Sequence, residues 1–255
     1  PEVPLTVEKF GTLNGRELNL TQEEDWKYLI SWWLDKVITE MESRDYEYID
    51  FAGIYWLAET LGTEVEPRLY AADIIHDAGY HFYWIPYFFA SGTLWADKAG
   101  FDTVALQPNH FFDEPMDTTS AGAGGTTRVD NAAKLASYGQ IGIEMEFDSR
   151  IMDSPHRYNQ YLDYLNSGVN NGFDGPNVYR AWYQGQRDLY PLAYAKQQQF
   201  RDLYDYTYQF MKGTLTNTIP HIEEFSDAPT DGSIGQGGSI GGGSGGGSSV
   251  TPDPD

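Results

Sequence analysis

The feature that most constrains this chain is the alternation of short β-type runs with segments of helical periodicity between residues 48 and 211. Such alternation is typical of βα units, in which crossover helices join parallel strands. The predicted strands are 48–57, 81–88, 101–107, 140–147 and 178–183. The predicted helices are 66–78, 94–99, 127–138, 154–169 and 193–211.

A further helix is expected ahead of the first strand, over residues 22–41, where apolar residues recur at helical spacing. Thr21 and Glu24 have the spacing of a capping box at its start. We therefore expect an α/β fold of the (β/α)8 TIM-barrel type. About five βα units are recognisable, whereas a closed barrel has eight, so the N-terminal units are expected to be missing.

The composition changes sharply near the C-terminus. From Gly232 the chain consists largely of Gly and Ser, and it ends in a Pro- and Asp-rich stretch. This composition cannot bury a core and is typical of a flexible spacer. We predict a barrel domain over residues 1–231 and a linker over 232–255. The linker is interpreted as a natural connection to a further domain of the parent protein, with an engineered spacer as the alternative.

Charge and cysteine content exclude several classes of function. The 255-residue chain has a formal net charge of -22, which disfavours nucleic acid and anionic membrane partners. It has no cysteine, which excludes disulfides, thiolate catalysis and zinc–thiolate sites. No apolar run is long enough for a transmembrane helix, so membrane insertion is not expected.

The run 140–148 carries the strongest chemical signal, because alternate side chains of a strand point to opposite faces. Ile141, Ile143, Met145 and Phe147 would form the face under the helices. Gly142, Glu144, Glu146 and Asp148 would then point into the barrel, rising toward the strand end where barrel active sites lie. Mutual repulsion would raise the pKa of at least one carboxylate. The alternative is an exposed edge strand with ordinary surface charges.

A second acid, Glu59, follows the strand that contains Tyr55 and Trp56. Counted back from the last strand, Glu59 follows the fourth strand and the Glu144 strand is the seventh. Many glycosidase barrels place the acid/base and the nucleophile at these positions, although a fold does not fix a function. The alternative for Glu59 is a structural role without catalytic function, as a helix cap or as an exposed loop residue.

Other candidates stand at strand ends, where aromatic rings can stack on sugars and polar groups can bind hydroxyls. The predicted substrate-binding residues are Tyr55, Trp56, Trp84, Tyr87, Gln107, Asn109, His110, Asp148 and Trp182. Core packing competes with this function for the aromatic residues, and stabilisation of a turn competes for Asn109 and His110.

Two weaker patterns are noted. The glycine-rich run 122–127 precedes a helix but lacks a phosphate-binding motif, and we interpret it as a flexible active-site loop. His110, Asp113, Glu114 and Asp117 are residue types that bind hard cations, but acidic loops of this kind are more often plain surface. No catalytic metal and no cofactor are predicted.

Three ordered motifs connect the chain to a known family. They are Trp84-Ile85-Pro86-Tyr87-Phe88, Gly100-Phe101-Asp102 with Leu106-Gln107-Pro108-Asn109-His110-Phe111-Phe112, and Gly142-Ile143-Glu144-Met145-Glu146-Phe147-Asp148. With these motifs the chain resembles the bacterial domain-of-unknown-function family 4855. The resemblance implies a glycosidase-like barrel, and an extracellular protein, secreted or at the cell surface, that is often joined to carbohydrate-binding or anchoring modules.

The leading hypothesis is a secreted glycoside hydrolase that acts on a polysaccharide or oligosaccharide. Glu59 would protonate the leaving oxygen and Glu146 would attack the anomeric carbon, with Glu144 and Asp148 tuning pKa values or holding hydroxyls. Glu144 is the alternative nucleophile. The other hypotheses are a non-catalytic carbohydrate-binding barrel and a structural cell-surface module.

Overall fold

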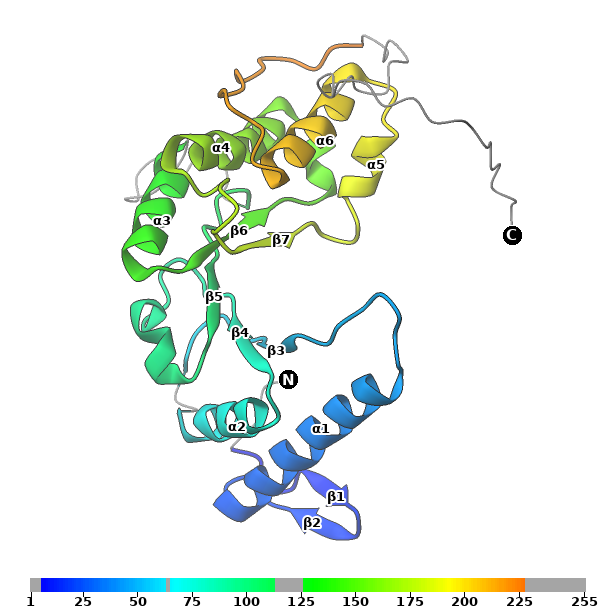
Figure 1. The fold of residues 1–255 in the computed structure, drawn as a ribbon, viewed down its shortest axis with the longest axis vertical. Helices are drawn as coiled ribbons and strands as arrows, with labels where there is room; N and C mark the ends of the chain where they lie inside the picture. The colour runs from blue at the N-terminus through cyan, green and yellow to red at the C-terminus, as the bar shows by residue number, and fades with distance from the viewer. Residues whose placement is uncertain (1–5, 63–64, 113–125, 228–255) are drawn as a thin grey trace, which may run out of the picture.

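A computed structural model of the protein describes residues 6–62, 65–112 and 126–227. Its centre is a parallel five-stranded sheet in which the strands pair in sequence order (Figure 1). The strands are β3 (Gly53–Trp56), β4 (His81–Trp84), β5 (Thr103–Leu106), β6 (Gly142–Glu146) and β7 (Arg180–Tyr183). All five predicted strands are therefore confirmed, although each is shorter than its predicted range.

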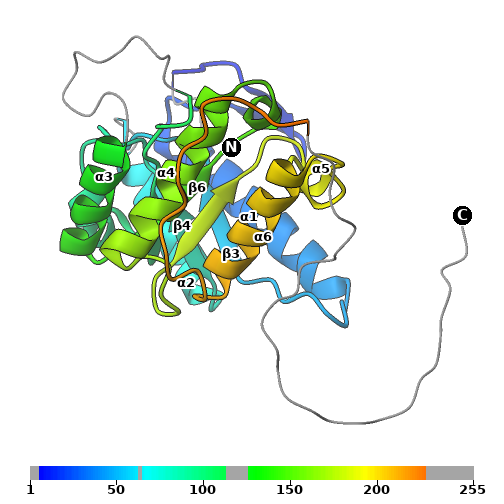
Figure 2. The same ribbon diagram turned by 90° about the horizontal axis from the view of Figure 1, so that it is seen from above.

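The sheet curls into a half-barrel with helices on its outer side (Figures 1 and 2). The connecting helices are α2 (Val65–Asp77), η1 (Thr93–Ala99), α3 (Thr126–Gly139), η2 (Ser149–Met152) and α4 (Pro155–Asn171). Two more, α5 (Leu189–Ala193) and α6 (Gln198–Met211), follow β7. The expected α/β class is confirmed, and a closed eight-stranded barrel is not formed by the described residues.

Two predictions about the helices need correction. The helix predicted over residues 193–211 is confirmed as α6 but begins only at Gln198, and residue 193 ends the separate short helix α5. The capping box is not formed at α1 (Glu23–Ser43), where Gln22 is the N-cap residue and makes no side-chain capping bond. The Thr21 hydroxyl instead donates a hydrogen bond of 2.7 Å to Oδ1 of Asn19, so it is occupied in the preceding turn.

The N-terminal segment contains a hairpin that the sequence analysis did not identify. Strands β1 (Gly11–Leu13) and β2 (Arg16–Leu18) pair antiparallel across the two-residue turn Asn14-Gly15. Both turn residues have positive φ, 50° and 82°, which Asn and Gly tolerate best. The hairpin was missed because its strands are only three residues long and largely exposed.

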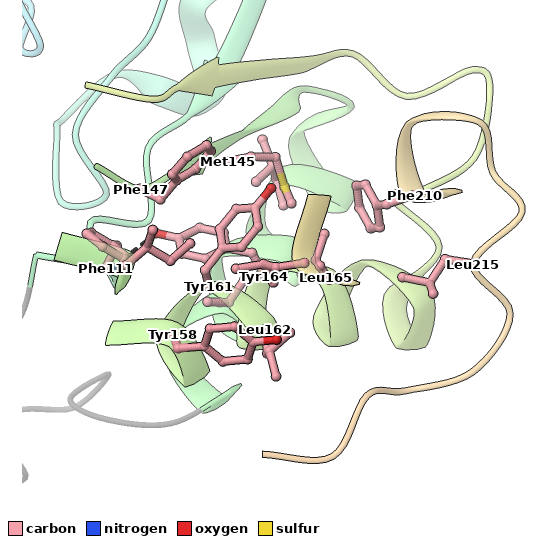
Figure 3. Close-up of a cluster of buried hydrophobic side chains, with 14 of the residues drawn as sticks. Phe111, Met145, Phe147, Tyr158, Tyr161, Leu162, Tyr164, Leu165, Phe210 and Leu215 are labelled. Carbon is pink, nitrogen blue, oxygen red and sulfur yellow. Dashed lines mark hydrogen bonds between the residues drawn. The ribbon is translucent and has the colours of Figure 1, made fainter. Parts of the chain in front are cut away.

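The hydrophobic core consists of two clusters on the outer side of the sheet. One joins β3 and β4 to α1, α2 and η1. The other joins β6 to α3, α4 and α6, and contains Met145, Phe147, Tyr161 and Tyr164 (Figure 3). Ile143, Met145 and Phe147 are fully buried there. The predicted apolar face of β6 therefore packs under the helices and leaves the opposite face to polar residues.

The predicted domain boundary at residue 231 and the linker 232–255 lie outside the described residues, as does most of the glycine-rich run 122–127. In the part of the chain that the structure describes, no helix is both long and apolar enough to cross a membrane.

Candidate active site

Strand β6 places two carboxylates on the concave face of the sheet. Glu144 and Glu146 alternate with the core residues Ile143 and Met145, as the period of two along a strand requires. Their neighbours in the register with β7 are Ala181 and Tyr183. Glu144 is 5% exposed and Glu146 is fully buried. Both carboxyl groups are therefore largely removed from water.

Glu146 is held by two donors from different parts of the chain. The Tyr164 hydroxyl of α4 and the main-chain N–H of Asn109 each donate to Oε2 over 2.5 Å. Among the described residues no group hydrogen bonds to Oε1. Burial raises the pKa of Glu146 to about 8, opposed by the Tyr164 and Asn109 bonds and by the charge of Arg128, while the charge of Glu144 adds to the shift.

Asn109 can donate to Glu146 because its main chain is left-handed, with φ 55°. Asn adopts this conformation more readily than most residues. The predicted role of the Asn109 side chain in substrate binding is untested, whereas its main chain has a structural role at the carboxylate.

Glu144 lies among polar and aromatic groups of the concave face. Burial raises its pKa to about 7, the charge of Glu59 adds to this shift, and a hydrogen bond from the Gln107 side chain opposes it. Burial also raises the pKa of Tyr55 to about 12, with contributions from the charges of Glu144 and Glu59. Glu59, Glu144, Tyr55 and Gln107 therefore form one electrostatic group.

Glu59 reaches this group from the segment after β3. Its side chain is exposed. Its carbonyl oxygen accepts a hydrogen bond of 3.0 Å from the N–H of Tyr87, and Tyr87 in turn forms a parallel bridge with Gln107. These main-chain links join the carboxyl ends of β3, β4 and β5. Three of the predicted site residues are thus brought to the same end of the sheet as Glu144.

Tyrosine rings extend the concave face away from the carboxylates. Tyr55 pairs in register with Tyr83 of β4. The Tyr83 ring stacks on that of Tyr179 at a centroid distance of 6.2 Å. Burial raises the pKa of Tyr179, as do the charges of Tyr83 and Glu144. Sequence reasoning missed Tyr179. It noted Tyr83 only as part of the aromatic run 83–88 and did not count it among the substrate-binding residues, although the alternation in β4 places Tyr83 on the face opposite to Trp84.

The predicted tryptophans do not lie on this face. Trp56 and Trp84 belong to the helix-side core, where Trp84 is fully buried and its indole N–H donates to the carbonyl of Ala58 over 2.8 Å. Trp182 packs against the other core cluster. All three lie at the strand positions that point outward, so their rings contribute to the core rather than to the concave site.

His110 and Asp148 are also placed differently from the sequence-based expectation. His110 is fully buried, and its Nε2 hydrogen bonds to Asp163 over 2.8 Å. Asp148 caps η2 and forms an ion pair of 2.8 Å with Arg150. Partial burial acts to raise the pKa of Asp148, but the Arg150 hydrogen bonds and charge outweigh it and lower the pKa. Neither side chain joins the Glu59–Glu144 group.

Two residues of the Glu146 environment carried no sequence signal. Tyr164 lies on α4, where its spacing resembles that of ordinary core residues. Arg128 lies on α3, with its guanidinium over the rings of Phe88 and Phe89. Only the packing of α3 and α4 against the sheet brings these residues to β6.

A metal site is not defined by the described residues, which contain no cluster of three or more His, Asp or Glu side chains able to hold an ion. Three of the four residues weighed for a cation, Asp113, Glu114 and Asp117, lie outside the described part of the chain.

Two cavities lined by described residues lie away from the Glu59–Glu144 group. One of about 800 Å³ lies near the amino ends of β5 and β6, and one of about 410 Å³ lies between α1 and β3.

Fold and site together define an α/β protein whose curled parallel sheet holds buried carboxylates on its concave face. The chain belongs to the family described as a domain of unknown function (DUF4855), whose model matches residues 1–209, and this confirms the resemblance seen in the motifs. No curated protein and no solved structure matches the chain significantly.

Proposed function

We propose that this protein is an extracellular glycoside hydrolase that cleaves a polysaccharide with Glu144 and Glu59 as its carboxylate pair. The observation that carries the proposal is the position of Glu144, which is almost buried on the concave face and lies within the electrostatic influence of Glu59. Glycosidic bond cleavage uses such a pair, one carboxyl protonated and the other charged.

In this mechanism Glu144 donates the proton to the leaving oxygen. A pKa of about 7 keeps a substantial fraction of Glu144 protonated at neutral pH. Glu59 supplies the negative charge, as a nucleophile if the carboxyls are about 5 Å apart or as a base toward water at about 6.5–9.5 Å. This assignment differs from the sequence-based one, in which Glu59 was the acid and Glu146 the nucleophile. Glu146 is fully buried and is therefore poorly placed to attack a sugar.

The aromatic groups support a carbohydrate as the substrate class. Tyr55, Tyr83 and Tyr179 present phenol rings on the same concave face as Glu144, and rings of this kind pack against the apolar faces of sugars while their hydroxyls form hydrogen bonds. Gln107 adds an amide at the same end of the sheet, and its Oε1 has no hydrogen-bond partner among the described residues.

The experiment is hydrolysis of a panel of polysaccharides by the wild-type protein and by Glu144→Gln and Glu59→Gln. Both substitutions are expected to lower turnover by about 100-fold or more, since general acid catalysis commonly contributes that much. Glu17→Gln, on the exposed strand β2, is the matched control and should remain active. Full activity of Glu144→Gln on a verified substrate would refute the proposal.

A second candidate is a non-catalytic carbohydrate-binding protein. It is favoured by the tyrosine rings, which would bind a sugar whether or not the acids are correctly spaced. Binding of a glycan by the wild type without product formation, with unchanged affinity in Glu144→Gln, would favour this function over catalysis.

We also propose that the curled sheet is part of a TIM-type barrel. Support comes from the parallel pairing of all five strands in sequence order and from the helices on the outer side. In such barrels active sites lie at the carboxyl ends of the strands, where Glu59, Gln107 and Glu144 gather.

A further inference from the structure

The chain after α6 is bound along one face of α4 by paired asparagine contacts. The Asn166 amide donates to the carbonyl of Ile219 over 2.9 Å and accepts from the Ile219 N–H over 2.7 Å. Asn159 makes the same two bonds with Ile222, of 2.8 and 2.9 Å. Two helix side chains thus pair with this segment as a neighbouring strand would. Figure 2 shows the segment in orange, passing over α4.

Asp163 lies between these two asparagines on the same face of α4. Its side chain is only 3% exposed, and each carboxylate oxygen meets one imidazole. Oδ1 lies 2.8 Å from Nε2 of His221, and Oδ2 lies 2.8 Å from Nε2 of His110. A single buried carboxylate therefore connects the segment after α6 with the segment after β5.

His110 is held by α4 at three points. Besides the ring contact with Asp163, its carbonyl accepts a bond of 2.8 Å from Gln160, and its N–H donates over 3.0 Å to the hydroxyl of Tyr164. The preceding residue is Asn109, whose left-handed main chain directs its N–H to Glu146. The orientation of His110 therefore determines where one of the two donors to Glu146 lies.

We propose that His221 is a positioning residue, which acts through Asp163 and His110 to hold the Asn109 N–H on the Glu146 carboxylate. We call residues 214–227 the C-terminal strap. The strap lies beyond residue 209, where the family match ends. It is nevertheless connected to the surroundings of Glu146 by contacts of ordinary hydrogen-bond length.

The direction of the effect follows from the bonds. Each imidazole can donate an Nε2–H to one oxygen of Asp163, and loss of His221 leaves Oδ1 of this buried side chain without its partner. The hydrogen bond from the Asn109 N–H favours the charged form of Glu146. When Asp163 and His110 shift, this bond weakens, and the pKa of Glu146 therefore rises. The Tyr164 bond, the charges of Arg128 and Glu144, and burial remain as the other influences on Glu146.

The test is a carboxyl NMR titration of Glu146 in the full chain, with the signal assigned by its loss in Glu146→Gln. His221→Ala should raise the pKa of Glu146 by about 0.5 to 1 unit, because a hydrogen bond to a carboxylate that is weakened but not broken loses only part of its effect. His221→Gln carries an N–H at a similar reach and should restore the wild-type titration. Glu223→Ala, exposed in the same strap, is the matched control.

Two results would overturn the inference: the same Glu146 titration in His221→Ala as in the control, or failure of His221→Gln to restore it. If His221→Ala does not fold, His221→Asn, whose shorter amide does not reach Asp163, takes its place with the same expected shift. An effect of His221 on turnover rests on the proposed function, whereas its effect on the pKa of Glu146 does not. A shifted titration in a protein without hydrolytic activity would refute the proposed function and leave this inference standing.

Discussion

The hydroxyl of Tyr164 donates a hydrogen bond of 2.5 Å to Oε2 of Glu146 and so joins helix α4 to strand β6. The same hydroxyl accepts the N–H of His110 over 3.0 Å. A fully buried phenol therefore satisfies an acceptor on the sheet and a donor in the segment after β5. This arrangement makes Tyr164 a structural centre of the candidate site.

Tyr164→Phe removes these two bonds and a longer one of 3.4 Å from the Phe111 N–H, while keeping the ring. Burial of one unsatisfied polar group costs about 1–3 kcal/mol, so the free energy of unfolding is expected to fall by that amount. Urea denaturation measures it. Tyr190→Phe, at a ring that is 66% exposed, is the control and should be neutral. Equal stability of the two variants would show that the Tyr164 bonds contribute nothing net.

The raised pKa values of the two glutamates predict a specific pH dependence of stability. Burial raises the pKa of Glu144 to about 7 and that of Glu146 to about 8, both from an ordinary value of 4.5. Between about pH 4.5 and pH 8 the folded state binds more protons than the unfolded state, so the free energy of unfolding falls as pH rises. The contribution is complete below about pH 4.5 and is lost as pH rises through the folded pKa values.

For one such group the decline is on the order of 1.4 kcal/mol per pH unit. Glu146→Gln cannot titrate and is expected to flatten the decline between about pH 5 and 8, whereas Glu17→Gln should retain it. Denaturant unfolding at several pH values measures both slopes. A wild-type stability that rises across this window would contradict the predicted protonation of the pair.

The sequence predicted the strands better than the site, and the difference has a physical cause. Alternation within 140–148 correctly separated Glu144 and Glu146 from Ile143 and Met145, because the period of a strand is local. The same reasoning placed Trp56, Trp84 and Trp182 in the site, because an aromatic residue at a strand end has no local signal for which face it occupies. Their neighbours Tyr55 and Tyr83 occupy the concave face instead.

Contacts distant in sequence were beyond such reasoning. Tyr164 reaches Glu146 across 18 residues, and His221 reaches Asp163 across 58. The burial of His110 could not be predicted for the same reason, since it depends on α4 and not on its own segment. Only the packing of helices on the sheet determines these partners.

Gly142 provides a test of strand packing at the start of β6. A Cβ at this position would lie 2.2 Å from the carbonyl oxygen of Tyr179, a backbone atom that cannot rotate away. Gly142→Ala is therefore expected to lower the free energy of unfolding by about 1–3 kcal/mol, as overpacking typically does. Gly175→Ala, where the nearest atom is 3.5 Å away, is the control. Thermal unfolding of both variants measures the difference.

Shortening the chain tests whether the C-terminal strap belongs to the folded domain. Ending the chain at residue 227 keeps the strap, whereas ending it at 213 removes Leu215, which is 6% exposed, and the ring contact of 5.0 Å between Phe225 and Phe200. It also leaves Asn159, Asp163 and Asn166 without their strap partners.

The chain ending at 213 should lose about 2 kcal/mol or more of unfolding free energy, because each large apolar side chain contributes about that much when fully buried. The chain ending at 227 should match the full chain in denaturant unfolding. If the two shortened chains are equally stable, the strap contributes no net stability, and the bonds along α4 are offset by the entropy lost in ordering it.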